Sequence, residues 1–106
     1  MSVRGNALKV VKELERALGS VDEGQGEAFV EAVLKAKTVF IAGAGRSGLM
    51  ARGFAMRLMH LGFDVHVAGD ATTPAIQKGD LLIVCSGSGE TASLASMVKK
   101  ATELGA

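Results

Sequence analysis

The sequence predicts an α/β protein built on a doubly wound parallel sheet, and three observations predict it. Short apolar runs at residues 38–42 and 81–85 lack polar alternation, which is typical of strands buried on both faces. Amphipathic patterns of helical length lie around these runs. The resulting order, two helices followed by β-α-β-β-α, favours three αβα layers with parallel strands. We expect the strand order 2-1-3, with a ligand crevice at the carboxyl ends of the first and third strands.

Two helices lead the chain. Apolar residues at helical spacing predict the first helix over residues 3–18. Ser20 and Glu23 have the spacing of a capping box, which indicates the start of a second helix. Two glycines in its first turns weaken this start and favour one nearer Glu27. We therefore expect a leading helical pair in residues 1–36.

Residues 37–106 are expected to form the core that carries the ligand site. Its predicted elements, in order, are a strand at 38–42, a helix at 47–61, a strand at 65–67, a connection over 69–79 with one helical turn, a strand at 81–85 and a helix that opens within 86–91.

The composition excludes several classes of function. The 106 residues include 12 Lys and Arg against 11 Asp and Glu, and neither Trp nor Tyr, so a nucleic-acid partner is not expected. Cys85 is the single cysteine, which excludes an internal disulfide and a multi-cysteine metal site, and we expect no metal. No apolar run reaches membrane-spanning length and the N-terminus lacks the core of a signal peptide, so a cytoplasmic location is expected.

The glycine-rich segment after the third strand indicates a phosphate site. Residues 86–91 read SGSGET and bring three hydroxyls and two glycines to a helix N-terminus. Backbone N–H groups and the helix dipole favour an anion there, and the hydroxyls add donors for a phosphate monoester. The alternative is a plain capped turn. The number of hydroxyls and glycines exceeds what a cap needs, which favours the phosphate interpretation.

The segment after the first strand, GAGRSG at residues 43–48, matches the dinucleotide pattern G-x-G-x-x-G, and Asp70 stands near the distance of a ribose-binding acid. However, Arg46 and Ser47 place a charge and a hydroxyl where small apolar residues would pack. A second phosphate-type loop is also foreign to the dinucleotide fingerprint. We therefore assign Arg46 and Ser47 to a small ligand that spans both loops; the alternative is a glycine turn needed only for packing.

Other reactive side chains have simpler interpretations. His60 lies roughly 20 Å from Ser47 along one helix, so it can serve only a neighbouring subunit's site, and a surface or interface role is favoured. His66, within a strand, is interpreted as structural. Cys85 is interpreted as a small hydrophobe. Met50 is assigned to the core or to a subunit interface.

These two loops, in this order and together with residues 49–63, resemble the SIS (sugar isomerase) domain, and specifically the 6-phospho-3-hexuloisomerase family. The resemblance implies an SIS/flavodoxin-like fold and the interconversion of D-arabino-hex-3-ulose 6-phosphate and fructose 6-phosphate through an enediol, without a cofactor. It implies a role in formaldehyde fixation by the ribulose monophosphate pathway, or in pentose supply. The predicted substrate-binding residues are Gly45, Arg46, Ser47, Ser86, Gly87, Ser88, Gly89, Glu90 and Thr91.

The chain departs from this family at its C-terminal end. Family members continue into further strand–helix units, where their catalytic carboxylate is expected, whereas this sequence ends at Ala106. We therefore expect a single partial SIS domain over residues 1–106 that binds a phosphosugar but is inactive alone. Glu90 is the one carboxylate in the two loops, and its charge fits a helix first turn better than catalysis. The third strand has an interior character and no further strand to pair with, which predicts a homo-oligomer formed through its free edge.

Three other functions stay open on the sequence. The chain could be a non-catalytic sugar-phosphate sensor, an engineered assembly fragment, or a dinucleotide- or flavin-binding module.

Overall fold

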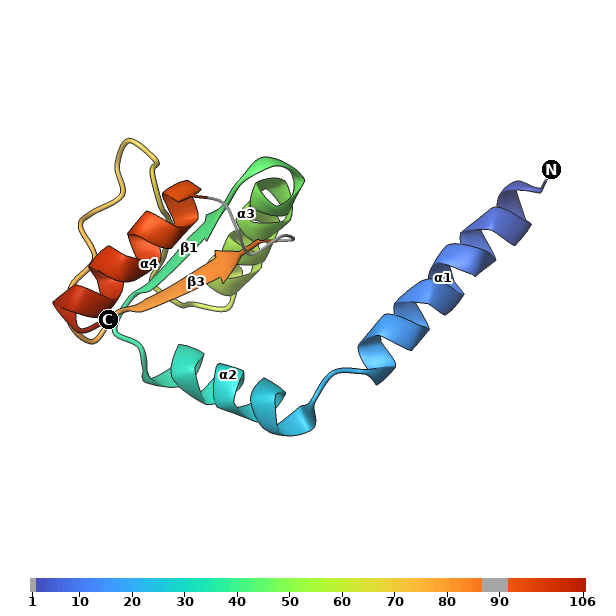
Figure 1. Ribbon diagram of the computed structural model, residues 1–106, viewed down its shortest axis with the longest axis horizontal. Helices are drawn as coiled ribbons and strands as arrows, with labels where there is room; N and C mark the ends of the chain where they lie inside the picture. Colours follow the sequence, from blue (N-terminus) through green and yellow to red (C-terminus); the bar gives the residue numbers. More distant parts are fainter. Residues whose placement is uncertain (1, 87–91) are drawn as a thin grey trace. The chain divides into compact units, whose positions relative to one another are not determined.

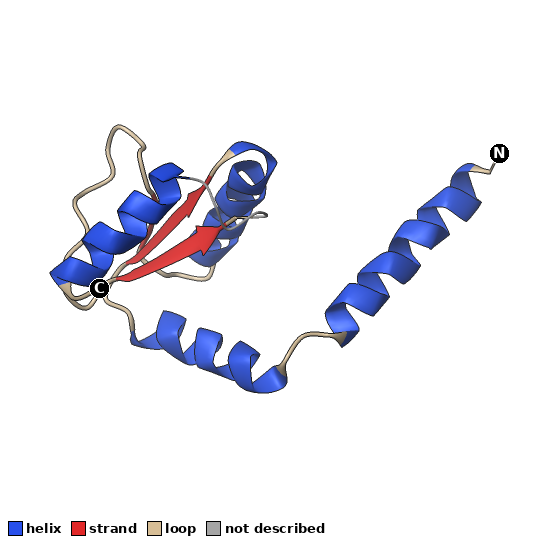
Figure 2. Cartoon of the chain, in the orientation of Figure 1, coloured by secondary structure: helices blue, strands red, loops and turns tan. Residues whose placement is uncertain are grey.

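The computed structural model describes residues 2–86 and 92–106. The chain divides into two compact units at residue 32, and each unit is described by itself. Figure 1 shows the chain from blue to red, and Figure 2 separates helices from strands. The elements in order are α1 (Val3–Gly19), α2 (Glu23–Lys35), β1 (Val39–Gly43), α3 (Gly45–His60), β2 (Val65–Val67), β3 (Leu81–Cys85) and α4 (Ala92–Leu104).

The first unit contains α1, whose two ends are capped by serine side chains. The Ser2 hydroxyl accepts a hydrogen bond of 3.0 Å from the backbone N–H of Gly5. At the other end the Ser20 hydroxyl donates to the Ala17 carbonyl at 2.7 Å. α1 is described over its whole length and has no buried residue, so its apolar stripe lies exposed.

The predicted capping box at Ser20 is wrong, because the Ser20 side chain ends α1 instead of starting α2. Asp22 starts α2: its carboxylate accepts from the N–H of Gly24 at 2.9 Å, and its carbonyl accepts from the N–H of Gly26 at 3.0 Å. The helix therefore begins at Glu23, and the start expected nearer Glu27 is also wrong. An Asp at the N-cap outweighs the two glycines of the first turns.

The second unit is built on a parallel sheet with β1 in the centre. β1 pairs with β2 on one side and β3 on the other, which confirms the predicted order 2-1-3. Phe40 lies opposite both His66 and Leu82. The first four residues of β1 are buried, whereas β2 and β3 are half-buried along their lengths, as expected for strands with one neighbour each among the described residues.

Helices cover both faces of this sheet. Ile41 is fully buried and belongs, with the α3 residues Ala51, Ala55 and Leu58, to the core on one face. Two alanines on the inner side of α3 allow the helix to approach the sheet closely. α4 lies on the opposite face in Figure 1, and its Ala101 is buried. The arrangement confirms the three-layer αβα fold.

Several boundaries of the elements differ from the predictions by one or two residues. α3 begins at Gly45 and ends at His60, one to two residues before the predicted helix at each end. Residues 68–80, all of which the structure describes, contain turns but no helix, so the predicted helical turn there is wrong. Thr73 holds the start of this connection in a turn, because its N–H donates to the Asp70 carbonyl at 3.1 Å and its hydroxyl donates to the Val67 carbonyl at 2.5 Å.

Candidate functional site

The loop between β1 and α3 depends on three glycines. Gly45 has a φ of +58°, a left-handed conformation that side chains rarely adopt. Gly43 and Gly48 approach so closely that a Cβ on Gly48 would lie 2.9 Å from the Gly43 carbonyl oxygen. These contacts explain the spacing of the G-x-G-x-x-G pattern: one glycine turns the chain, and two let the first turn of the helix rest on the strand end.

A shallow opening of about 340 Å³ lies between the first turns of α3, which follows β1, and the carboxyl end of β3. Arg46 and Ser47, from the first turn of α3, line it together with Ser86, which follows β3. Arg46 is exposed, and Ser47 and Ser86 are half-buried. One guanidinium and two hydroxyls thus meet at the switch point of the sheet, where open α/β sheets bind ligands. This set of donors suits the oxygens of a phosphate or a sugar.

Two further residues complete this opening, and the sequence analysis missed both as site residues. Met50 and Cys85 line it beside Arg46. Met50 is 73% exposed, so the core alternative is wrong, and its assignment to a subunit interface stays a prediction. A signal for Met50 was present, because it stands four residues after Arg46 and shares its helix face. Cys85 directly precedes Ser86, at the strand end that the crevice rule identifies.

Other predicted substrate-binding residues are placed differently. Gly45 lines a neighbouring cavity between α3 and β2, not the opening that contains Arg46. The remaining predicted residues lie outside the described part of the chain: Gly87, Ser88, Gly89, Glu90 and Thr91.

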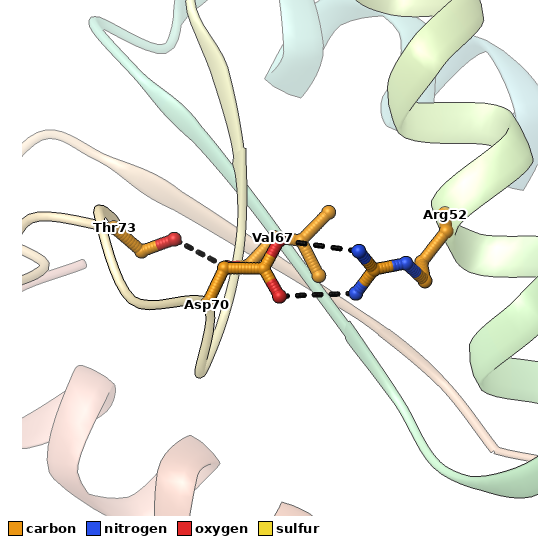
Figure 3. Close-up of polar contacts among 4 residues, drawn as sticks. All are labelled: Arg52, Val67, Asp70 and Thr73. Carbon is orange, nitrogen blue, oxygen red and sulfur yellow. Dashed lines mark hydrogen bonds and ion pairs between the residues drawn. The ribbon is translucent and has the colours of Figure 1, made fainter.

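The cavity between α3 and β2 has about 230 Å³ and is lined in part by Arg52, which forms an ion pair. Figure 3 shows the Arg52 guanidinium facing the Asp70 carboxylate, with Nη1–Oδ1 and Nη2–Oδ2 distances of 3.0 and 3.3 Å. Both oxygens of Asp70 are therefore engaged. A ribose-binding acid must accept from the ribose hydroxyls, so a ribose would have to compete with Arg52 for this carboxylate, which weighs against the dinucleotide interpretation.

The two histidines lie apart from the opening. His60 is the last residue of α3 and is exposed, whereas Ser47 is in the first turn of the same helix. The imidazole of His66 lies 3.1 Å from an Asp64 carboxylate oxygen and stacks on Phe40 with a centroid distance of 5.7 Å. The second carboxylate oxygen of Asp64 accepts from the Thr38 hydroxyl at 2.8 Å. His66 thus supports the start of the sheet, in accordance with its structural interpretation.

Within the described ranges, 2–86 and 92–106, no three His, Cys, Asp or Glu side chains cluster so as to hold a metal ion. None of the helices in those ranges combines the length and the apolar character needed to cross a membrane.

A family model described as the SIS domain matches residues 32–106. The chain belongs to the SIS domain family. The matched range covers β1, both glycine-rich segments and α4, so the opening lined by Arg46, Ser47 and Ser86 lies entirely within the SIS domain.

Curated relatives of this SIS domain include two proteins named 3-hexulose-6-phosphate isomerase. The protein from Mycobacterium gastri is 48% identical over 102 residues, which is 95% of this chain and 51% of the relative. The one from Bacillus subtilis is 44% identical over 96 residues, 91% of this chain and 52% of the relative. The chain thus spans about half the length of the curated relatives it matches.

A solved structure from Methanococcus jannaschii has the same fold, with a TM-score of 0.80 and 41% identity over 93% of this chain and 59% of that one. The molecular function inferred for that protein is that of a 3-hexulose-6-phosphate isomerase.

Proposed function

We propose that this chain is the phosphosugar-binding part of a 3-hexulose-6-phosphate isomerase. The observation that carries the proposal is the opening between the first turns of α3 and the end of β3, where Arg46, Ser47 and Ser86 bring a positive charge and two hydroxyls to one place. The relatives of that name support the choice of a hexulose 6-phosphate over other phosphate esters. Residues 87–91 would add amide and hydroxyl donors to the phosphate. We place this function in the cytoplasm.

The proposed reaction moves a carbonyl between neighbouring carbons. A base removes the proton from C2 of the 3-ketose, the electrons form a C2–C3 double bond in an enediolate, and a proton returned to C3 leaves the carbonyl at C2 of fructose 6-phosphate. Proton exchange between the two oxygens completes the balance, and no oxidant is consumed. Donors near the two oxygens would stabilise the enediolate charge.

In this proposal the described residues bind and orient the substrate. Arg46 and Ser47 would hold the phosphosugar through charge-assisted hydrogen bonds, which fixes the reacting carbons relative to the base. We assign the base to the half of the relatives that this chain does not span. The chain alone is therefore expected to bind fructose 6-phosphate without converting it.

Titration with fructose 6-phosphate, followed by amide chemical shifts, tests the proposal. We expect saturable shifts at Arg46, Ser47 and Ser86, and loss of binding in the double variant Ser47→Ala with Ser86→Ala. Ser96→Ala, an exposed serine on the outer side of α4, is the matched control and should leave binding unchanged. Unchanged affinity for fructose 6-phosphate in the double variant would show that these hydroxyls do not form the binding site. Tight binding of FMN or NADH without a response to fructose 6-phosphate would favour a nucleotide module instead. Turnover of hexulose 6-phosphate by this chain would contradict both the assignment of the base and a purely sensory role.

A further inference from the structure

A second cavity lies on the opposite face of the sheet, beneath α4. It has a volume of about 280 Å³ and shares no residue with the opening that contains Arg46. Its floor is formed by Phe40 of β1 and Leu82 of β3, and the α4 residues Met97, Ala101 and Leu104 form one wall. The connection between β2 and β3 forms the other wall, from Gly69 to Ile76.

The cavity exists because this connection is not helical. Doubly wound folds cover both faces of the sheet with helices, whereas residues 68–80 cross this face as turns joined by an irregular stretch that includes Pro74. In Figure 1 this yellow-to-orange connection arches beside red α4. Ala101 has no side chain beyond Cβ to fill the space between them. Apolar side chains therefore line a hollow that the chain itself leaves unfilled.

The charges around this cavity are not balanced. Asp70 lines it, but both carboxylate oxygens of Asp70 already face Arg52. Lys100 also lines it and is exposed, which places its ammonium group at the mouth. Among the described residues, the Lys100 side chain makes no hydrogen bond or ion pair, so the cavity has one positive charge that no described carboxylate pairs with.

We propose that this cavity binds a small amphipathic carboxylate, a medium-chain fatty acid, with the apolar body against Phe40 and Leu82 and the carboxylate at Lys100. The volume is sufficient, because an apolar cavity of about 150 Å³ is enough to hold a benzene ring. Burial of an apolar body contributes roughly 25 cal/mol per Å² removed from water, and the single charge selects the anion over a neutral analogue. The proposal is independent of the isomerase function.

Octanoate, followed by methyl and amide NMR shifts, tests the site. We expect saturable shifts at Leu82, Met97 and Leu104. Lys100→Gln should weaken octanoate binding about five-fold and leave binding of the neutral octan-1-ol unchanged. Lys99→Gln, an exposed lysine outside the cavity, is the matched control and should change neither.

A second pair of variants tests the cavity itself. Ala101→Met should fill the hollow and abolish binding of both octanoate and octan-1-ol, whereas Ala95→Met, on the exposed side of α4, should bind both as before. If Ala101→Met fails to fold, the test of the proposal is the binding of octanoate and of octan-1-ol to Lys100→Gln. Non-saturable shifts spread over the exposed apolar residues of α1 would overturn the proposal. Equal weakening of octanoate and octan-1-ol binding in Lys100→Gln would overturn it as well.

Discussion

Arg52 and Asp70 form a two-pronged ion pair that joins α3 to the connection after β2. The two side chains are 55% and 43% exposed, so water screens the pair and its contribution to stability is at most about 1 kcal/mol. The importance of the pair is chemical. The carboxylate that follows the second strand of a dinucleotide-binding fold must accept from ribose, and here each of its oxygens already accepts from a guanidinium, with which a ribose would have to compete.

We therefore predict that the protein does not bind NADH. Fluorescence titration should show no saturable change, in the native sequence or in Asp70→Asn. Arg52→Met releases the carboxylate and should not create binding either, because Arg46 and Ser47 still occupy the loop positions that a pyrophosphate approaches. Saturable NADH binding that Asp70→Asn abolishes would contradict this prediction and restore the dinucleotide interpretation.

Substitution by alanine is expected to have opposite effects on stability at two glycines of α3, Gly48 and Gly53. Only Gly48 approaches β1 closely, at Gly43. Gly48→Ala would place a Cβ 2.9 Å from a backbone oxygen, which cannot move without shifting β1. We expect a loss of roughly 1–3 kcal/mol in the free energy of unfolding, despite the better helix propensity of alanine. Urea denaturation measures this.

Gly53→Ala is the matched control, because a Cβ there meets no atom within 4 Å and the residue lies exposed in the middle of α3. It should raise the free energy of unfolding by up to about 1 kcal/mol. Equal effects of the two substitutions would show that Gly43 and Gly48 do not make the contact described.

Much of the fold could be predicted because its signals are local. β2 and β3 match the predicted ranges to the residue, since each is a short apolar run bounded by polar residues or glycine. The start of α2 could not be predicted. The spacing of Ser20 and Glu23 fits a capping box. However, Ser20 lies between two helices, and its hydroxyl can bond to the end of the first or to the start of the second. The sequence does not distinguish these two hydrogen bonds, and the structure shows the first.

The binding sites also include one part that the sequence could predict and one part that it could not. Arg46, Ser47 and Ser86 could be placed together because the crevice of a parallel sheet follows from strand order alone. The cavity under α4 could not be predicted, because it depends on how the connection over residues 68–80 packs against Phe40. No local sequence pattern predicts that packing.

Arg46 should supply charge to the proposed phosphosugar site. Arg46→Gln is expected to weaken fructose 6-phosphate binding roughly ten-fold, the equivalent of one charge-assisted hydrogen bond, and to reduce the salt dependence of the affinity. Calorimetric titration at two ionic strengths measures both. Arg57→Gln removes an equally exposed arginine from the last turn of α3 and should leave binding unchanged. Unchanged binding in Arg46→Gln would restrict the site to its hydroxyls and amides.

The free edge of β3 should cause self-association. The N–H of Leu81 donates to the Thr38 carbonyl beside β1 at 3.0 Å. Backbone groups of successive residues in a strand point to opposite sides, so Ile83 also faces β1, whereas Leu82 and Val84 present unpaired N–H and C=O groups at the edge of the described sheet. Such an edge is a template for another strand, and the half-buried apolar side chains of β3 favour its coverage.

Val84→Pro removes a donor from this free edge without removing a hydrogen bond to β1, and proline is tolerated at such positions. We expect sedimentation equilibrium to show a concentration-dependent oligomer for the native sequence and a weaker one for Val84→Pro, with the far-ultraviolet circular dichroism retained. Ile83→Pro is the contrasting variant: it removes a donor that faces β1, so it should unfold the sheet. A native chain that stays monomeric at tens of micromolar would refute association through this edge. Association that Val84→Pro leaves intact would instead assign the contact to the exposed apolar stripe of α1, whose Leu8, Leu14 and Leu18 are 54%, 57% and 70% exposed.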